Sequence, residues 1–133
     1  MSTLIEKLVA IVGKPNVITA QKDQTKYITD WPGVITGRAR AVVRPSNTQE
    51  VSKIMELAYH TRTPVVPQSG NTGVAGGSIP DQSGDAIVLS LERMNIIRDV
   101  SRPAQTIVVE AGCVLETIHT TVEELGLFFP LNF

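Results

Sequence analysis

The segment PQSGNTGVAGGS, residues 67–78, has four glycines and no charged residue among its twelve positions. Fixing a glycine costs more backbone entropy than fixing any other residue, so a stretch this rich in glycine needs a reason to persist. It could be a disordered tip, a series of tight turns, or a loop that another molecule must approach closely. The surrounding sequence helps to choose among these.

A strand, a helix and a second strand precede the glycine-rich segment. The expected elements are a strand at 38–44 (RARAVVR), a helix from Asn47 to about Thr61 and a strand at 64–68 (PVVPQ). Such a βαβ unit has parallel strands and a right-handed crossover. The segment therefore leaves the carboxyl end of the second strand, the edge at which open α/β sheets usually bind ligands.

The composition of the segment allows an anion site made of backbone. Its glycines permit positive φ and remove side chains, so successive N–H groups can point into one concavity. The glycines are Gly70, Gly73, Gly76 and Gly77, and the neutral side-chain donors are Asn71, Thr72 and Ser78. A Walker loop would need a Lys, and the dinucleotide fingerprint needs a different glycine spacing. From spacing alone, diphosphate binding and a flexible surface loop both stay open.

The rest of the chain predicts an α+β fold. Thr3 and Glu6 form a capping box that starts a helix ending at Gly13, and residues 16–37 are expected to be irregular. Short breaks favour antiparallel pairing of three later strands, at 86–90, 95–100 and 106–111. A last helix should run from about Val114 to Leu125. These elements suggest one part over 1–80 and a second over 81–133.

Composition narrows the class of protein. Apolar residues make up 42% of the chain, the net charge is -1, and Cys113 is the one cysteine. These features argue for a packed domain without an internal disulfide and against a nucleic-acid partner. The sequence shows no transmembrane run and no signal peptide, so we expect a cytoplasmic protein. It also lacks metal-ligand spacing, and no metal is expected.

The chain stops in an apolar cluster, LFFPLNF, residues 127–133. This ending suggests that the chain is cut within its fold, so that the fold is incomplete. The alternative is a C-terminal strand that docks in the core. An uncovered cluster would favour self-association.

Several other residues have structural explanations that we prefer to functional ones. His60 and His119 lie on separate predicted helices, and Cys113 is read as a small buried hydrophobe. Tyr27 and Trp31 are expected to pack on the core. Three arginines that alternate along one strand are read as a solvated face: Arg38, Arg40 and Arg44.

The segment 67–78 closely resembles the pyrophosphate loop of the FAD-linked oxidases, which include flavin dehydrogenases of D-2-hydroxy acids such as D-lactate, D-2-hydroxyglutarate and glycolate. The family pattern, roughly P-x-[GS]-G-N-T-G-x-x-G-G, is met from Pro67 to Gly77. Tyr27 and Asp30 resemble the family's opening Y-x-x-D, and VVEAGCVL followed by GLFFPL resembles a later strand, helix and turn. The resemblance covers nearly the whole chain.

The resemblance implies an FAD-linked-oxidase-type domain of two subdomains with FAD between them. It assigns the cofactor to Pro67, Ser69, Gly70, Asn71, Thr72, Gly73, Gly76, Gly77 and Ser78, with Gly112 and Pro130 in segments that usually line it. Relatives that attach the flavin covalently carry S-G-G-H in this loop. Thr72 stands at the His position here, so non-covalent FAD is expected.

The implied activity is oxidation of a D-2-hydroxy acid with hydride transfer to FAD. The electron acceptor is unknown and the catalytic residues are unassigned, since in the family they lie beyond the segment matched here. Two alternatives stay open: an FAD-dependent alcohol or alditol oxidase of the same superfamily, and a non-catalytic flavin or nucleotide module.

Overall fold

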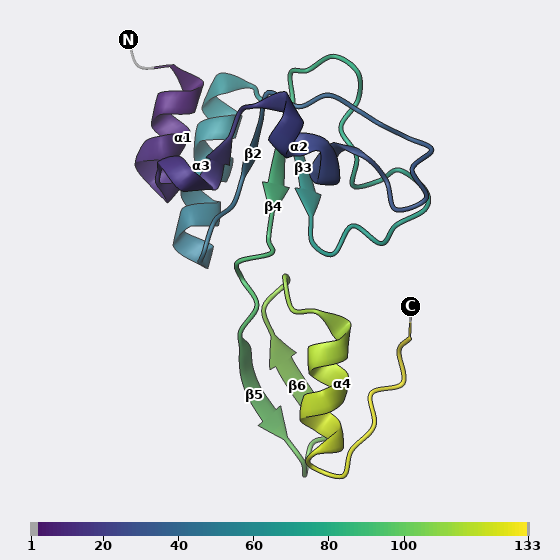
Figure 1. Cartoon of the computed structure of the whole chain (residues 1–133). Coiled ribbons are helices and arrows are strands. Elements are labelled where there is room, and N and C mark those ends of the chain that lie inside the picture. The colour runs from purple at the N-terminus through teal and green to yellow at the C-terminus, as the bar shows by residue number, and fades with distance from the viewer. Residues whose placement is uncertain (1–2, 133) are drawn as a thin grey trace.

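Two sheets organise the chain in the computed structural model, which describes residues 3–132 (Figure 1). The first has the strand order β1-β2-β4-β3. Its strands are β1 (Val17–Ile18), β2 (Ala41–Val43), β3 (Val65–Gln68) and β4 (Ile87–Ser90). The second is a hairpin of β5 (Ile97–Ser101) and β6 (Thr106–Val109), and α4 (Leu115–Glu123) follows it.

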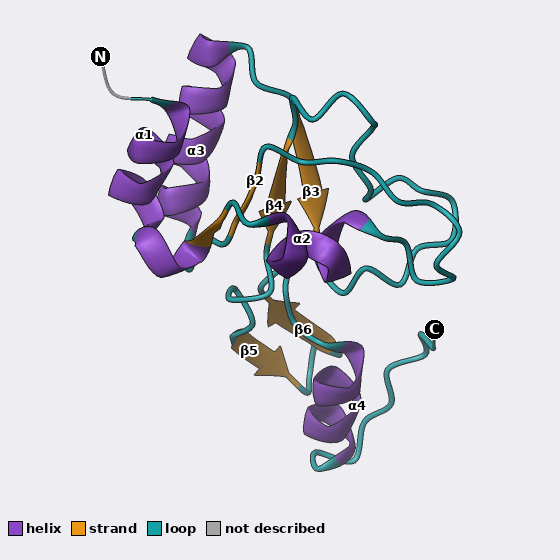
Figure 2. Cartoon of the chain, turned by 45° about the horizontal axis from the view of Figure 1, so that its top comes forward, coloured by secondary structure: helices purple, strands orange, loops and turns teal. Residues whose placement is uncertain are grey.

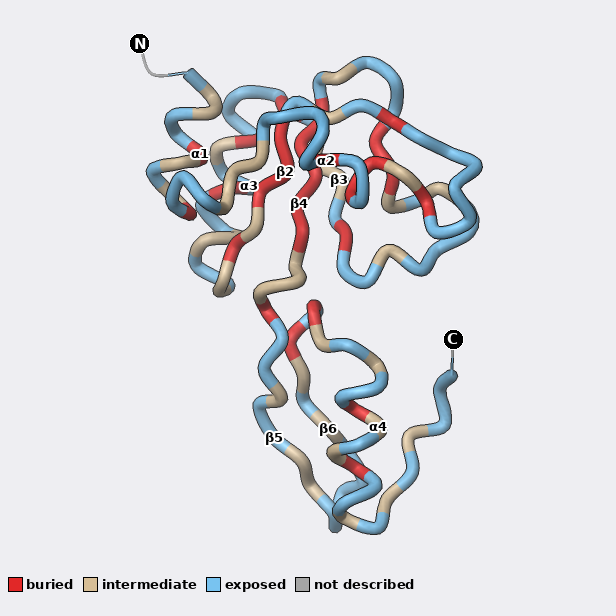
Figure 3. Tube along the Cα trace, in the orientation of Figure 1, coloured by how far each residue is buried: buried red, intermediate tan, exposed pale blue. Residues whose placement is uncertain are grey.

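Helices cover both faces of the first sheet, which makes three layers (Figure 2). Side chains alternate across a strand, and Val43 and Leu89 accordingly pack with α1 (Leu4–Val12) and α3 (Thr48–Thr61). Their neighbours Val42 and Val88 pack on the other side against α2 (Gln21–Ile28). Burial is concentrated in β2 and β4, whereas the hairpin is half exposed (Figure 3).

Capping residues fix the starts of α1 and α3 where the sequence predicts. The Thr3 side chain accepts from Glu6 N at 3.2 Å, and Glu6 Oε2 accepts from Thr3 N at 2.7 Å, which confirms the capping box. At α3, the Asn47 side chain accepts from Glu50 N at 2.9 Å. These bonds satisfy N–H groups that would otherwise lack partners at the helix starts.

The prediction that residues 16–37 are irregular is wrong. The segment contains a 3-10 turn (Lys14–Asn16) at its start, β1 and α2. The α2 helix has no side-chain N-cap and is polar on average, so local signals are weak. It is stabilised by burial of Gln24, Tyr27 and Ile28. The remaining predicted elements exist, with β2 shorter than the expected 38–44.

The expected antiparallel pairing is correct for β5 and β6 and wrong for β4. Strand β4 pairs parallel with both β2 and β3 and lies between them. The βαβ strands are therefore parallel as predicted, but they are not adjacent. The change from parallel to antiparallel strands comes after Ser90. The predicted division near residue 80 therefore groups β4 with β5 and β6, whereas β4 belongs to the first sheet. The reason is the long segment 69–86, which returns the chain to the middle of the sheet.

The segment after α4 forms no helix or strand within the described residues, which contradicts the docked terminal strand. Phe128 is 80% exposed and Leu131 46%, while Leu127 and Phe129 are half-buried. Phe133, part of the predicted cluster, lies outside the described residues. Self-association through this surface stays a prediction.

Candidate functional site

A cleft of about 1270 Å³ lies between the glycine-rich loop and the second group of elements. One wall is the loop, from Ser69 to Ser78 without Gly76. The opposite wall is the segment 111–116 with one face of α4, and Phe129 and Leu131 line it further along. Glu92 and Asn95, from the connector between the two sheets, complete the lining.

Most of the residues predicted to bind a cofactor come together in this cleft. Eight of the eleven line it: Ser69, Gly70, Asn71, Thr72, Gly73, Gly77, Ser78 and Gly112. The other three do not line the cleft. Pro67 lies on β3, and Gly76 and Pro130 lie next to residues that do line it. The predicted loop residues are neighbours in the sequence, and the loop bends around a single cleft.

The backbone of the loop is rich in unused donors. Within residues 3–132, no backbone N–H from Gly70 through Ser78 donates to another protein group. Most of these residues are exposed, so their N–H groups are open to solvent beside the cleft and are available to a ligand that enters it. Consecutive N–H groups of this kind suit an anion such as a diphosphate.

Side chains in the loop are used differently from the prediction. Asn71 Nδ2 donates to Thr29 O at 2.8 Å and to Lys26 O at 3.2 Å. Ser78 Oγ donates to Asn71 Oδ1 at 3.0 Å, and Ser69 Oγ donates to Ala111 O at 2.8 Å. Asn71 and Ser78 were expected to be donors for a ligand, but together with Ser69 they tie the loop to α2 and to the opposite wall. Among the predicted donors, Thr72 alone has no such bond within the described residues.

The loop is also held from below by a buried amide. Gln68, at the end of β3, is 4% exposed. Its Nε2 donates to Tyr27 O at 2.7 Å and to Ser78 O at 3.0 Å, which joins the two ends of the loop to α2. Sequence reasoning missed this role, because a Gln after a strand carries no signal of its partner.

Positive φ is needed at fewer loop positions than expected. Of the four glycines, Gly76 alone has it, at +76°, and Asn71 is left-handed at +52°. A Cβ added at Gly73 or Gly77 would meet no protein atom within 4 Å. The absence of side chains therefore leaves open space beside the chain at Gly73 and Gly77, both of which line the cleft.

Gly112 lines the same cleft for another reason. A Cβ there would lie 1.9 Å from Leu91 O and 2.7 Å from Met94 O. Its own N–H donates to Met94 O at 2.8 Å. The protein backbone passes so close that a side chain has no room at this position.

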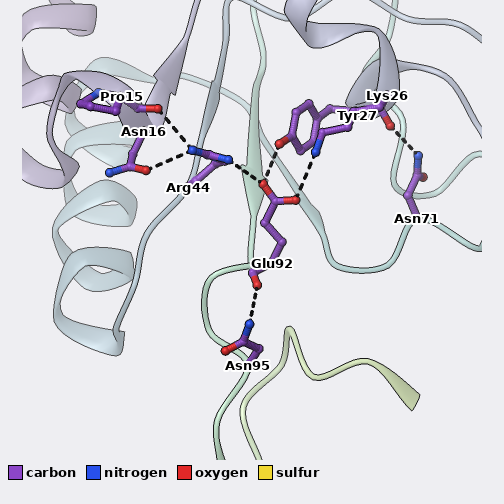
Figure 4. A network of polar contacts seen from close by, with 8 residues as sticks. All are labelled: Pro15, Asn16, Lys26, Tyr27, Arg44, Asn71, Glu92 and Asn95. Atoms are coloured by element: carbon purple, nitrogen blue, oxygen red, sulfur yellow. Dashed lines mark hydrogen bonds and ion pairs between the residues drawn. The ribbon is translucent and has the colours of Figure 1, made fainter. Parts of the chain in front are cut away.

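Two acidic residues line the cleft, Glu92 and Glu116, and sequence reasoning missed the role of Glu92. Its Oε1 accepts from Tyr27 Oη at 2.6 Å and from Arg44 Nη1 at 3.1 Å, and Lys26 Nζ lies 3.6 Å from Oε2 (Figure 4). Arg44 is thus a partner of Glu92, and reading it as part of a solvated face was wrong. Tyr27 packs in the core as predicted, whereas Trp31 is 73% exposed.

The partners of Glu92 shape the charge of the cleft. Burial would raise the pKa of Glu92, but the hydrogen bonds from Tyr27 and Arg44 outweigh it and hold that pKa below 4.5. No Lys or Arg lines the cleft within the described residues. An anion there would depend on backbone N–H groups. The charge of Glu92 is compensated by Lys26 and Arg44, while Glu116 also lines the cleft.

Two further side chains reach the cleft. His119 Nε2 hydrogen-bonds Leu131 O at 2.8 Å, which holds the last described segment against α4. Cys113 is half-buried and also lines the cleft, so it is not the buried core residue that was expected. His60 lies on α3, outside this cleft.

Among residues 3–132 there is no cluster of three His, Cys, Asp or Glu suited to a metal ion. None of the described helices has the length and apolar character to cross a membrane.

Comparisons with known proteins agree with this geometry. A family model described as "FAD binding domain" matches residues 39–133. The D-2-hydroxyglutarate dehydrogenase of Arabidopsis thaliana, a mitochondrial protein by name, is 37% identical over 122 residues, 92% of this chain and 22% of that protein. The D-2-hydroxyglutarate dehydrogenase of Xanthomonas citri is 34% identical over 115 residues, 86% of this chain and 24% of that protein.

Among solved structures, alkyldihydroxyacetonephosphate synthase superposes with a TM-score of 0.80 at 16% identity. The match covers 92% of this chain and 25% of that one, and it shows the shared fold. The chain therefore spans about a quarter of the length of the relatives that it matches. It belongs to the FAD-binding domain family of flavoprotein oxidoreductases.

Proposed function

We propose that the loop 69–78 binds the diphosphate of FAD through its backbone N–H groups. The observation that carries the proposal is the run of unpaired N–H groups from Gly70 to Ser78 beside a cleft of about 1270 Å³. The open space beside Gly73 and Gly77 would admit phosphate oxygens close to the backbone. The residues present therefore fit the cofactor that the family implies.

Each group in the site would have a defined task. Asn71, Ser69 and Gln68 hold the loop in shape before the ligand arrives, which lowers the entropy cost of binding. The apolar wall at Val114, Ile118 and Phe129 would exclude water from the ring system. Bound FAD supplies the hydride acceptor, and these residues supply binding and orientation.

We propose a D-2-hydroxy acid as the substrate of the natural protein, with D-2-hydroxyglutarate the first compound to test. The support is the family and the names of the two relatives, both D-2-hydroxyglutarate dehydrogenases. D-lactate and glycolate are the next candidates. An FAD-dependent alcohol or alditol oxidase and a non-catalytic flavin module are the competing outcomes.

The test is anaerobic reduction of the purified natural protein reconstituted with FAD. D-2-hydroxyglutarate should bleach the flavin absorbance, while L-2-hydroxyglutarate should not. Bleaching by a primary alcohol or alditol alone would favour the oxidase alternative. A protein that binds FAD but is reduced by none of these compounds would favour the non-catalytic module.

We further propose that the FAD is held non-covalently. Thr72 occupies the position at which covalent relatives carry His, and a hydroxyl is far less nucleophilic than an imidazole near neutral pH. Acid precipitation should release all of the flavin into the supernatant. Flavin fluorescence on the protein band after denaturing electrophoresis would contradict this.

A cytoplasmic location stays a prediction, and the Arabidopsis relative named above is mitochondrial. Fractionation of cells that produce the natural protein would decide it. The electron acceptor is a separate question, to be answered by the acceptor that reoxidises the reduced protein.

A further inference from the structure

The two walls of the cleft meet at the connector Leu91–Ile96. Leu91 N donates to Gln68 O at 2.8 Å, which joins the connector to the strand that carries the loop. On the other side, Gly112 N donates to Met94 O at 2.8 Å and Glu110 N to Ile96 O at 2.9 Å. The connector, together with the direct bond from Ser69 Oγ to Ala111 O at 2.8 Å, therefore sets how far the wall at 110–116 stands from the loop.

Glu92 is the charged anchor of this connector. Its carboxylate is bound by Tyr27 and Lys26 of α2 and by Arg44, which follows β2 (Figure 4). Arg44 is itself fixed, because Nη2 donates to Pro15 O and to Asn16 Oδ1, each at 3.3 Å. One side chain thus ties the connector to α2 and to the segment after β2, and through Arg44 to the turn at Pro15 and Asn16.

The same network reaches the loop. Lys26 pairs with Glu92 through its ammonium, and its backbone carbonyl accepts from Asn71 Nδ2 at 3.2 Å. Tyr27 O accepts from Gln68 at 2.7 Å. The short α2 segment therefore holds the loop by its carbonyls and the connector by its side chains.

A negative charge at Glu92 should by itself weaken the binding of an anion in the cleft. Glu92 lines a cleft suited to an anion, and its side chain is 33% exposed. A like charge beside a diphosphate weakens binding unless it is compensated. Lys26 and Arg44 provide that compensation, and together with Tyr27 they fix the position of Glu92.

We propose that Glu92 is a positioning residue, which holds the two walls of the cleft at the separation that FAD requires. The inference rests on the proposed function, since FAD is the ligand concerned. It predicts that removing the negative charge weakens binding of a negatively charged ligand, the opposite of what a purely electrostatic role predicts.

The first arm of the test measures FAD affinity of the purified natural protein by quenching of flavin fluorescence. Glu92→Ala should raise the Kd by about tenfold. Tyr27→Phe, which removes one hydroxyl and leaves Glu92 charged, should raise it by about threefold, and should have no further effect in Glu92→Ala. The control is Asp85→Ala, which removes an exposed ion pair with Arg40 outside the cleft and should leave the Kd unchanged.

The second arm measures amide hydrogen exchange without FAD. The N–H groups of Gly112 and Glu110, which bond the connector, should exchange faster in Glu92→Ala and in Tyr27→Phe than in the parent. A general loss of stability would speed exchange in β2 and β4 as well, so those strands serve as the internal reference.

Equal or tighter FAD binding by a folded Glu92→Ala variant would overturn the proposal. So would unchanged exchange at Gly112 and Glu110. If Glu92→Ala does not fold, Tyr27→Phe gives the same two readouts with a milder change. If the parent does not bind FAD, the proposed function fails, and the exchange measurement still decides whether Glu92 positions the wall.

Discussion

Two glycine-containing regions line the same cleft for different reasons. At Gly112, a Cβ would stand 1.9 Å from Leu91 O, so the protein itself requires glycine. At Gly73 and Gly77, a Cβ would meet nothing within 4 Å. The protein gives no packing reason for the two loop glycines. The space beside them is available to a ligand, whereas the space beside Gly112 is already filled.

The backbone donors show the same contrast. The N–H of Gly112 is bonded to Met94 O, whereas the N–H groups from Gly70 to Ser78 have no protein partner within the described residues. The hydrogen bonds of the Gly112 region are made within the protein, whereas the loop N–H groups are available to a ligand. Substitutions at Gly112 should therefore lower stability, whereas substitutions at the loop glycines should lower ligand affinity.

The largest expected effect is that of Gly112→Ala on stability. The added methyl group would collide with backbone on two sides, and backbone cannot move aside as a flexible side chain does. We expect a loss of about 3 kcal/mol or more in the free energy of unfolding, at or beyond the upper end of overpacking costs. Urea denaturation of the natural protein measures it, with Gly73→Ala as the control. A Gly112→Ala variant as stable as the parent would show that the connector has room to move.

Gly73→Val should have the opposite profile. The branched side chain would occupy the open space beside the loop, and φ at Gly73 is not positive, so the fold should tolerate it. We expect FAD to bind about 100-fold more weakly, with unfolding unchanged. Gly76 is a poorer site for this test, because its φ is +76° and a Cβ would lie 3.0 Å from Ile35 Cδ1. Retention of full affinity by Gly73→Val would remove the loop from the site.

A smaller effect is expected at the side chain that anchors the loop. Asn71→Asp replaces an amide that donates to two carbonyls with a carboxylate that cannot donate. Leaving such partners unsatisfied should cost about 1–3 kcal/mol of stability, read from thermal or urea unfolding. Asn95→Asp is the matched control, since Asn95 is exposed and makes one long bond of 3.4 Å. Equal losses in the two variants would contradict the anchoring role.

The smallest effect concerns pH. The hydrogen bond from Arg98 Nη2 at 2.9 Å, helped by that from Ile96 N, holds the pKa of Glu110 below 4.5. A carboxyl with a lowered folded pKa contributes stability above its unfolded pKa and loses it as pH falls through the folded value. Stability should therefore fall below about pH 4.5, the usual Glu pKa, and Glu110→Gln should flatten part of that fall. An identical pH profile for parent and Glu110→Gln would show that Glu110 does not contribute.

Local signals predicted much of this molecule. The valine-rich runs around Val42 and Val66, the capping residues Thr3 and Asn47, and the position of the loop after β3 all follow from short stretches of chain. The helix α2 and the placing of β4 between β2 and β3 do not, because tertiary burial decides them. Strand spacing cannot reveal that a long loop carries the chain back across a sheet.

The site divides in the same way. The run of glycines after a strand left both a backbone anion site and a flexible loop open, and the family resemblance supplied the eleven predicted residues, eight of which line the cleft. Sequence reasoning could not show that Asn71 and Ser69 bond to protein, nor that Glu92 meets Arg44 across 48 positions of chain. Those contacts join segments far apart in sequence, and single residues carry no mark of such partners.

The most direct test of the central claim is the response of individual backbone N–H groups to FAD, measured by ¹H–¹⁵N NMR of this chain. Addition of FAD, and separately of ADP, should shift the resonances of Gly70 to Ser78, because their free N–H groups acquire phosphate acceptors. The Gly112 resonance should move far less, because its N–H is already bonded to Met94 O. Loop resonances that stay in place at saturating FAD, or shifts confined to residues outside the loop, would contradict the account.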